Sequence, residues 1–121
     1  MVNYFFDTYA LIEIVRNSPN YIKYLEEPIT TTRFNLVEFL YIILAEQGKD
    51  AAKKAFEKFK NAAEDVPDDI LLKAVEFRLK NRGKGLSYVD CIGYVFAVEN
   101  NIKFLTGDDA FEKMENVEFV K

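Results

Sequence analysis

The sequence predicts an α/β fold, a three-layer α/β/α sandwich with a central parallel sheet, in a single domain covering residues 1–121. Short runs rich in β-branched and aromatic residues, typical of buried strands, recur along the chain. Longer segments whose apolar residues are spaced three and four apart, typical of amphipathic helices, lie between those runs. The chain has 121 residues and is half hydrophobic, so it can form the core that such a domain needs.

Strands are predicted where short runs of strand-forming residues are bounded by turn-forming residues. Residues 2–6 form the first run, residues 29–32 the second and residues 102–106 the third, and residues 117–120 are expected to add a last strand. Because helical segments separate the first three strands, we expect right-handed crossovers and a parallel sheet with helices on both faces.

Helices are predicted from apolar periodicity and from the glycine, proline and asparagine residues that end them. Gly48 ends the most apolar of these segments, and Pro67 interrupts the chain after the amphipathic segment that contains Phe56 and Phe59. The predicted helical segments are residues 9–16, 21–27, 35–47, 49–64, 70–80, 87–100 and 110–114, with a loop at residues 65–69 and a turn at residues 81–85.

Composition restricts the chemistry that this chain can perform. It contains no histidine, which removes Ser-His-Asp and Cys-His catalysis and the usual histidine-rich zinc sites. Cys91 is the only cysteine, so a disulfide framework is excluded and a reducing, cytoplasmic location is expected. No apolar run reaches the roughly 18 residues needed to span a membrane, and residues 1–4 do not resemble a secretion signal. The remaining carboxylates favour hard cations such as Mg²⁺ or Mn²⁺.

Two acidic residues follow predicted strands. Asp7 comes directly after the first strand, and Asp108 comes shortly after the third. Because sites in open parallel sheets form beyond the carboxyl ends of the strands, we expect both at the same edge. Each also has a simpler interpretation: Asp7 as a helix N-cap, and Asp108 as a turn residue, with Asp109 its rival for any functional role.

Two further acids lie in apolar helical segments. Glu38 is the only charge among residues 34–44, and a buried lone carboxylate is costly unless it is paired, metal-bound or protonated. The simpler interpretation is an ion pair with Arg33 or an exposed edge position. Asp90 stands three residues after Ser87, which resembles a capping box at a helix start; a capping role and a site role can coexist.

Four segments carry a pattern that covers essentially the whole chain: Phe5-Phe6-Asp7-Thr8, Asn35-Leu36-Val37-Glu38-Phe39-Leu40, Leu86-Ser87-Tyr88-Val89-Asp90-Cys91-Ile92 and Phe104-Leu105-Thr106-Gly107-Asp108-Asp109-Ala110-Phe111. In this order they resemble the PIN domain family, in particular the VapC-type toxins and their stand-alone relatives. Asp108, rather than Asp109, matches the family's fourth acid, because it stands two residues after Thr106 and three before Phe111. The family often has a strand before the helix at residues 70–80. Here residues 61–69 are acidic and contain Pro67, which argues against that strand.

The resemblance implies a metal-dependent endoribonuclease that hydrolyses RNA phosphodiester bonds, leaving 5′-phosphate and 3′-hydroxyl ends. It implies that Mg²⁺ or Mn²⁺ is held by four acids, Asp7, Glu38, Asp90 and Asp108. Thr8 and Thr106 would be supporting hydroxyls, and Asp109 would assist from further out. It also implies a homodimer and a small antitoxin partner, as in a toxin–antitoxin pair. A stand-alone RNA-processing nuclease is the alternative within the family.

RNA contacts are expected from basic residues near the predicted site. The net charge of −4 argues against a nucleic-acid partner, but setting the four acids aside leaves 16 acidic residues, equal to the 16 basic ones. Tyr88 is a candidate for stacking on a base, with core packing as its alternative. The candidate phosphate contacts, for each of which a solvated helix end is the simpler interpretation, are Arg33, Arg78, Lys80, Arg82 and Lys84.

Two other classes of protein share parts of this pattern. A phosphoacceptor receiver domain needs an acid pair after the first strand and a central acceptor aspartate, but Asp7 stands alone and no acid ends a mid-chain strand. A non-catalytic interaction module, with its acids merely capping helices, would not be stabilised by Mn²⁺, whereas a metal-binding protein would. The two interpretations therefore differ in a measurable property.

Overall fold

The computed structural model describes residues 3–121 and contains a five-stranded sheet in the order β3-β2-β1-β4-β5. Every neighbouring pair of strands is parallel, which confirms the predicted sheet. Residue 2, the first of the predicted first strand, lies outside the described residues. The strands are β1 (Tyr4–Phe6), β2 (Ile29–Thr32), β3 (Ala63–Glu64), β4 (Lys103–Thr106) and β5 (Val117–Phe119).

The helices follow the predicted segments with small shifts at their ends. Residues 19–26 and 109–111 form 3₁₀ turns rather than the two short helices expected there. Among residues 3–121, no helix is long and apolar enough to cross a membrane. The helical elements are α1 (Thr8–Val15), η1 (Pro19–Glu26), α2 (Arg33–Gln47), α3 (Lys49–Phe59), η2 (Lys60–Ala62), α4 (Asp68–Lys80), α5 (Tyr88–Glu99) and η3 (Asp109–Phe111).

The strand β3 corrects the sequence analysis, which extended a helix to residue 64 and argued against a strand at residues 61–69. The α3 helix ends at Phe59, whose buried ring packs against Phe39, and η2 turns the chain back toward the sheet. Ala63 and Glu64 then pair with the end of β2. A two-residue strand at the sheet edge leaves Pro67 outside the ladder, so proline does not exclude it. Its partner comes from a distant segment, which local periodicity does not reveal.

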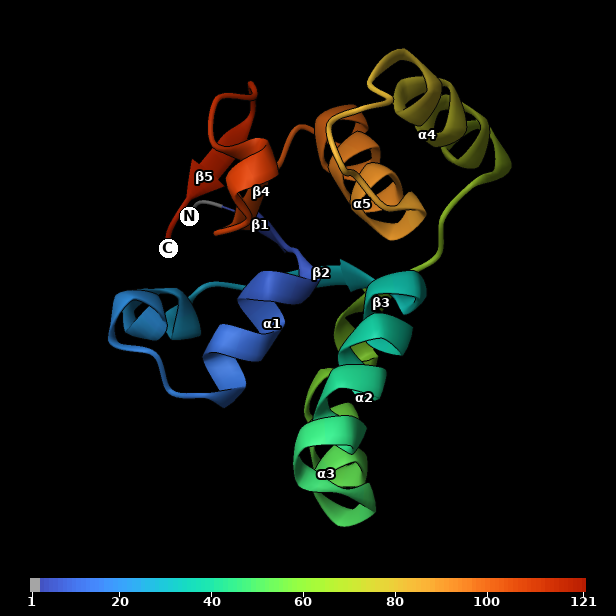
Figure 1. The fold of residues 1–121 in the computed structure, drawn as a ribbon. Helices are drawn as coiled ribbons and strands as arrows, with labels where there is room; N and C mark the ends of the chain where they lie inside the picture. Colours follow the sequence, from blue (N-terminus) through green and yellow to red (C-terminus); the bar gives the residue numbers. More distant parts are fainter. Residues whose placement is uncertain (1–2) are drawn as a thin grey trace.

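Successive side chains along the central strands point to opposite faces of the sheet. Phe6 and Leu105 belong to a core formed with α1, η1, α2 and α3. Phe5 and Phe104, one position earlier, belong to a second core formed with α4 and α5. Figure 1 shows the α1 and α2–α3 elements and the α4–α5 pair on different sides of the strands. The predicted three-layer sandwich is therefore confirmed.

The carboxyl ends of the strands form the edge where the candidate residues gather. Asp7 directly follows β1, α2 begins directly after β2, and Gly107 and Asp108 follow β4. Gly107 is required at this edge because a Cβ atom there would lie 2.3 Å from both Tyr9 Cε1 and the Val120 carbonyl oxygen. The close approach of α1 and the C-terminal segment to this turn fixes the position of β4's end.

Candidate functional site

Asp7 is the most enclosed of the four acids, with 2% of its surface exposed. Thr106 Oγ1 donates a 2.8 Å hydrogen bond to its Oδ2, and Asn35 Nδ2 donates a long one of 3.5 Å to its Oδ1. Asp7 occupies the N-cap position of α1, but its side chain makes no capping hydrogen bond. Capping therefore does not explain why a carboxylate is buried here.

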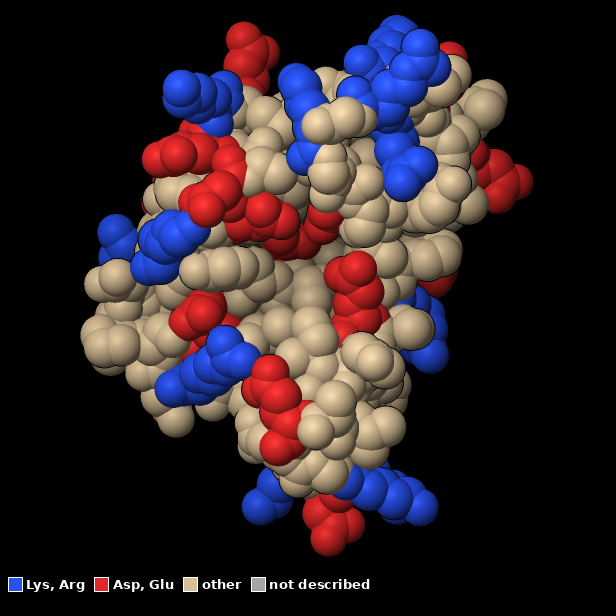
Figure 2. Space-filling model, viewed as in Figure 1, with Lys and Arg blue, Asp and Glu red and all other residues tan. Residues whose placement is uncertain are grey.

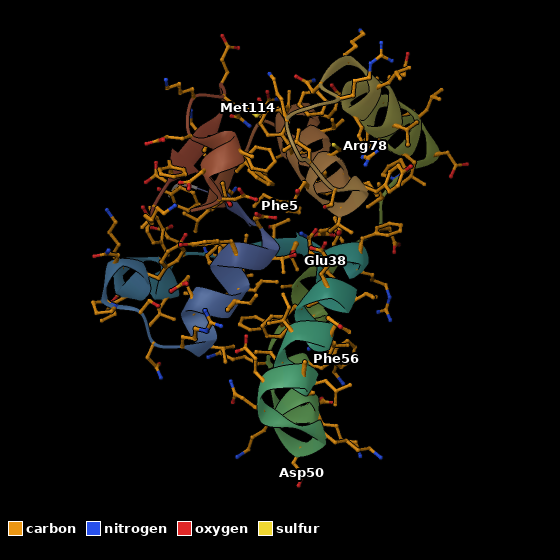
Figure 3. All side chains as sticks on the ribbon, viewed as in Figure 1. Phe5, Glu38, Asp50, Phe56, Arg78 and Met114 are labelled. Carbon is orange, nitrogen blue, oxygen red and sulfur yellow. The ribbon has the colours of Figure 1, made fainter. Side chains whose placement is uncertain are left out.

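Glu38 lies in the first half of α2 and is partly buried. Its Oε1 accepts a 2.8 Å hydrogen bond from Thr8 Oγ1, at the start of α1. Arg33 is exposed, and no ion pair between it and Glu38 is present within residues 3–121. Figure 3 shows Glu38 between the N-terminal end of α2 and the lower end of α5. The simpler interpretation of Glu38 as half of an ion pair with Arg33 is not supported.

Asp90 is held by the predicted capping box at the start of α5. Ser87 N donates to Asp90 Oδ2 across 2.9 Å, and Asp90 N donates to Ser87 Oγ across 3.0 Å. The box confirms the local interpretation of this segment. It occupies one carboxylate oxygen, and no donor to the other is found in the described part of the chain.

Asp108 caps the short η3 turn, with Ala110 N donating to its Oδ1 across 3.0 Å. Its own backbone N–H donates to Thr106 Oγ1, the same hydroxyl that bonds to Asp7. Asp109 lies apart: its side chain is exposed and pairs with Lys121 Nζ. The structure thus separates the two neighbouring acids and places Asp108 with the group and Asp109 outside it.

The pKa values of three of the acids are raised, by burial first and then by the charges of the other acids. Burial raises the pKa of Asp7 to about 8, with further increases from the charges of Asp90 and Glu38. Burial is also the main cause that raises the pKa of Asp90, and the charge of Asp108 raises it further. The pKa of Glu38 is raised by burial and, in addition, by the charge of Asp90. Figure 2 shows acidic side chains gathered along a hollow in the middle of this face. The structure therefore brings Asp7, Glu38, Asp90 and Asp108 into one electrostatically coupled group.

Within the part of the chain that the structure describes, this acidic group has no cationic partner. Among residues 3–121, no ion pair links any of the four carboxylates to lysine or arginine. Carboxylates facing each other without a counter-charge are the donor set that a hard divalent cation fits. Within the same residues, no three acidic or cysteine side chains are close enough to enclose an ion as they stand. Each carboxylate instead takes hydrogen bonds from neighbouring donors.

Sequence reasoning missed Asn35 and Thr32, which are both fully buried beside the acids. Asn35 Nδ2 donates to Thr8 Oγ1 across 3.1 Å, and Thr32 Oγ1 donates to Asn35 Oδ1 across 2.7 Å. The available signal was an amide side chain in a mostly apolar helix, one turn before Glu38. Thr8 and Thr106, which the sequence analysis did select, donate hydrogen bonds to Glu38 and Asp7 respectively.

The candidate RNA contacts divide into two kinds. Arg82 and Lys84 are exposed in the connection between α4 and α5, as are Arg33 and Lys80 on their helices. Arg78 is partly buried: its Nε donates to the Leu86 carbonyl, and its guanidinium lies 4.1 Å from the ring centroid of Tyr88. Figure 2 shows basic side chains gathered over the α4 end of this face.

Tyr88 is 60% exposed, so the core-packing alternative for this residue is not supported. The ring stands at the start of α5, where it lies against the Arg78 guanidinium of α4 and stays exposed to solvent.

Comparisons with known proteins agree with this fold. VapC20 from Mycobacterium tuberculosis, described as a sarcin-ricin loop cleaving toxin, matches with a TM-score of 0.76 and 17% identity, over 95% of this chain and 98% of that one. A toxin-antitoxin complex from Klebsiella pneumoniae matches with a TM-score of 0.74 and 18% identity, over 96% of each chain. VapBC2 from Rickettsia felis, bound to a DNA fragment from its promoter, matches with a TM-score of 0.73 and 18% identity, over 99% of this chain and 98% of that one. At these identities the likeness establishes the fold alone.

Sequence comparison identifies the family. No curated protein matches the chain significantly. The family model described as "PIN domain" matches residues 4–117, which include all four acids and nearly every element of the sheet. The chain therefore belongs to the PIN domain family.

Proposed function

We propose that this protein is a metal-dependent endoribonuclease that hydrolyses RNA phosphodiester bonds, and that it is the toxin of a toxin–antitoxin pair. Its membership of the PIN domain family and the solved toxin structures that share its fold support this proposal. The observation that carries it is the group of four carboxylates without a basic partner among the described residues, in which Asp7 is buried and its pKa is raised.

Asp7, Glu38, Asp90 and Asp108 would hold Mg²⁺ or Mn²⁺, directly or through water. A bound divalent ion supplies an activated water and neutralises negative charge on the reacting phosphate. The surrounding protein orients the ligands: Thr106 holds Asp7 from β4, and Thr8 holds Glu38 from α1. These hydroxyls limit the rotation of the two carboxylates, which favours a pre-organised site.

The RNA must bind next to an acidic group, so basic side chains have to supply the attraction. Arg82 and Lys84 are exposed and lie in the segment that leads into the α5 helix and Asp90. We assign them, with Arg33 and Arg78, to phosphate contacts. Tyr88 offers an exposed ring for stacking on an unpaired base.

The deciding experiment compares the RNA cleavage rate of a variant in an acid of the proposed site with that of a variant in an acid outside it. Wild-type protein, freed of metal and then given Mn²⁺, should cut a labelled single-stranded RNA. Asp90→Asn should lower cleavage by at least about a hundredfold. Asp109→Asn is the matched control, because Asp109 is exposed and paired with Lys121, and it should stay within about twofold of wild type. Equal activity of Asp90→Asn and Asp109→Asn would contradict the proposed site.

The toxin role predicts a protein partner. Several solved structures with this fold are toxin–antitoxin complexes. An exposed apolar stripe along α2 is available for such a partner, with side chains three to four residues apart: Phe34, Val37, Tyr41 and Leu44. A small protein encoded beside this gene should bind it and inhibit RNA cleavage. A stand-alone RNA-processing role is the alternative, and the absence of any such gene would favour it.

Two further features complete the proposal. We expect a homodimer, which light scattering on the purified protein would test. We also expect a cytoplasmic location, where the lone, buried Cys91 remains a thiol.

A further inference from the structure

Asn35 is the one side chain that contacts both the Asp7 carboxylate and the hydroxyl that holds Glu38, among the hydrogen bonds of residues 3–121. It is fully buried, at the third position of α2 and one turn before Glu38. A buried amide is retained only where its donors and acceptors are satisfied, because an unpaired buried polar group is costly. Its partners therefore indicate what the residue does.

The N-cap residue of α2 fixes the amide on one side. Thr32 Oγ1 donates its single proton to Asn35 Oδ1 across 2.7 Å and accepts the backbone N–H of Asn35 across 3.2 Å. The carbonyl side of the amide therefore faces Thr32 and accepts its proton. The NH₂ side consequently faces the acids.

The chain of donors beyond the amide has only one consistent direction. Asn35 Nδ2 donates to Thr8 Oγ1 across 3.1 Å, and Thr8 Oγ1 donates to Glu38 Oε1 across 2.8 Å. When Asp7 is ionised, as a metal ligand is, a reversed amide would place Oδ1 against Asp7 Oδ1, two acceptors facing each other. It would also require the Thr8 proton that Glu38 now receives. The amide thus ties the end of β1 to α2 by directed hydrogen bonds.

Building on the proposed function, we propose that Asn35 is a positioning residue of the carboxylate site: its amide sets where Asp7 and Glu38 lie relative to each other, and thereby the affinity of the site for a divalent cation. Asn35 itself holds no ion. It acts through Asp7 on one side and through Thr8 on the other. Losing the amide should weaken metal binding even when the fold persists.

The test measures Mn²⁺ affinity by titration calorimetry on the metal-free protein. Asn35→Leu keeps the size of the side chain and removes its donors, and should raise the Kd for Mn²⁺ about tenfold or more. The matched control is Tyr94→Phe on α5, which removes a hydrogen bond from a buried side chain to the Glu115 carbonyl and touches neither the four acids nor their hydrogen-bond partners. Tyr94→Phe should lower the melting temperature but leave the Kd within about twofold.

A second pair of variants keeps the test decisive if Asn35→Leu does not fold. Thr32→Val removes the hydrogen bond to the Asn35 carbonyl oxygen and should raise the Kd for Mn²⁺ several-fold. Thr32→Ser retains the hydroxyl and should keep the Kd near the wild-type value. Equal Mn²⁺ affinity in the Asn35 and Thr32 variants and in Tyr94→Phe would overturn the positioning role alone. Wild-type protein that binds no Mn²⁺ would overturn the proposed function together with it.

Discussion

Thr106 Oγ1 donates a 2.8 Å hydrogen bond to Asp7 Oδ2, joining the ends of β4 and β1 across 99 residues of chain. The same oxygen accepts the backbone N–H of Asp108. One hydroxyl therefore orients one acid of the group directly and fixes the backbone of another. The carboxyl edge of the sheet is held by side-chain contacts as well as by the strand ladder.

Removing that hydroxyl should reduce RNA cleavage. Thr106→Val keeps the shape of the side chain but leaves Asp7 Oδ2 and the Asp108 N–H without their partner. We expect RNA cleavage to fall about 10- to 100-fold. Thr106→Ser keeps the hydroxyl and should stay within a few-fold. Cleavage rates at saturating Mn²⁺ check this, and an unchanged rate in Thr106→Val would contradict the role of the hydroxyl.

Metal-free protein should become less stable as pH rises. The folded state keeps the Asp7 proton up to a pKa of about 8, whereas the unfolded chain releases it near the ordinary value of 3.8. Between these values the folded state binds more protons, so the free energy of unfolding falls with increasing pH, by up to about 1.4 kcal/mol for each unit of pKa shift. The raised pKa values of Glu38 and Asp90 act in the same direction.

Urea denaturation in the presence of a chelator, at about pH 5 and about pH 8, measures this loss. Asp7→Asn removes the largest contribution and should show a much flatter pH dependence. Added Mn²⁺ should oppose the loss at the higher pH, because an ion bound only by the folded state stabilises it. Equal pH dependence in wild type and Asp7→Asn would show that Asp7 is not the group responsible.

Gly107→Ala should be severely destabilising. Its Cβ would lie 2.3 Å from the Val120 carbonyl oxygen, a backbone atom, and 2.3 Å from Tyr9 Cε1. We expect a loss of about 3 kcal/mol or more. Gly93→Ala is the graded comparison, because its nearest contact is the Phe5 ring at 2.9 Å, and it should cost less. Thermal unfolding of both variants checks the order; the reverse order would contradict the geometry.

The exposed basic residues between α4 and α5 should contribute to RNA affinity independently of the RNA sequence. In an Asp90→Asn background, Arg82→Ala should weaken binding of single-stranded RNA and reduce the slope of log affinity against log salt by about 0.7. Lys53→Ala removes an exposed charge on α3, away from α4 and α5, and should leave the slope unchanged (Figure 1). Fluorescence anisotropy over a salt series measures both. An equal effect of the two changes would indicate general charge attraction instead of a contact at Arg82.

The elements with strong local signals were predictable. The strand at residues 29–32 agrees at both ends, because a β-branched run bounded by turn residues has few alternatives. The capping box at Ser87 and Asp90 was also visible, since it depends on two residues three positions apart. The strand β3 was missed because Ala63 and Glu64 form it only by pairing with Thr31 and Thr32.

The sequence by itself determined the alternation of strands and helices and the absence of histidine chemistry, and it singled out the four acids together with Thr8 and Thr106. These features depend on residue type and on the pattern of neighbouring residues, so they can be deduced without coordinates. Only the tertiary structure decided that Asp109 pairs with Lys121, and that Asn35 links Asp7 to Thr8. Those outcomes depend on burial and hydrogen bonding between segments far apart in the chain, which become defined only when the sheet brings the ends of β1, β2 and β4 to one edge.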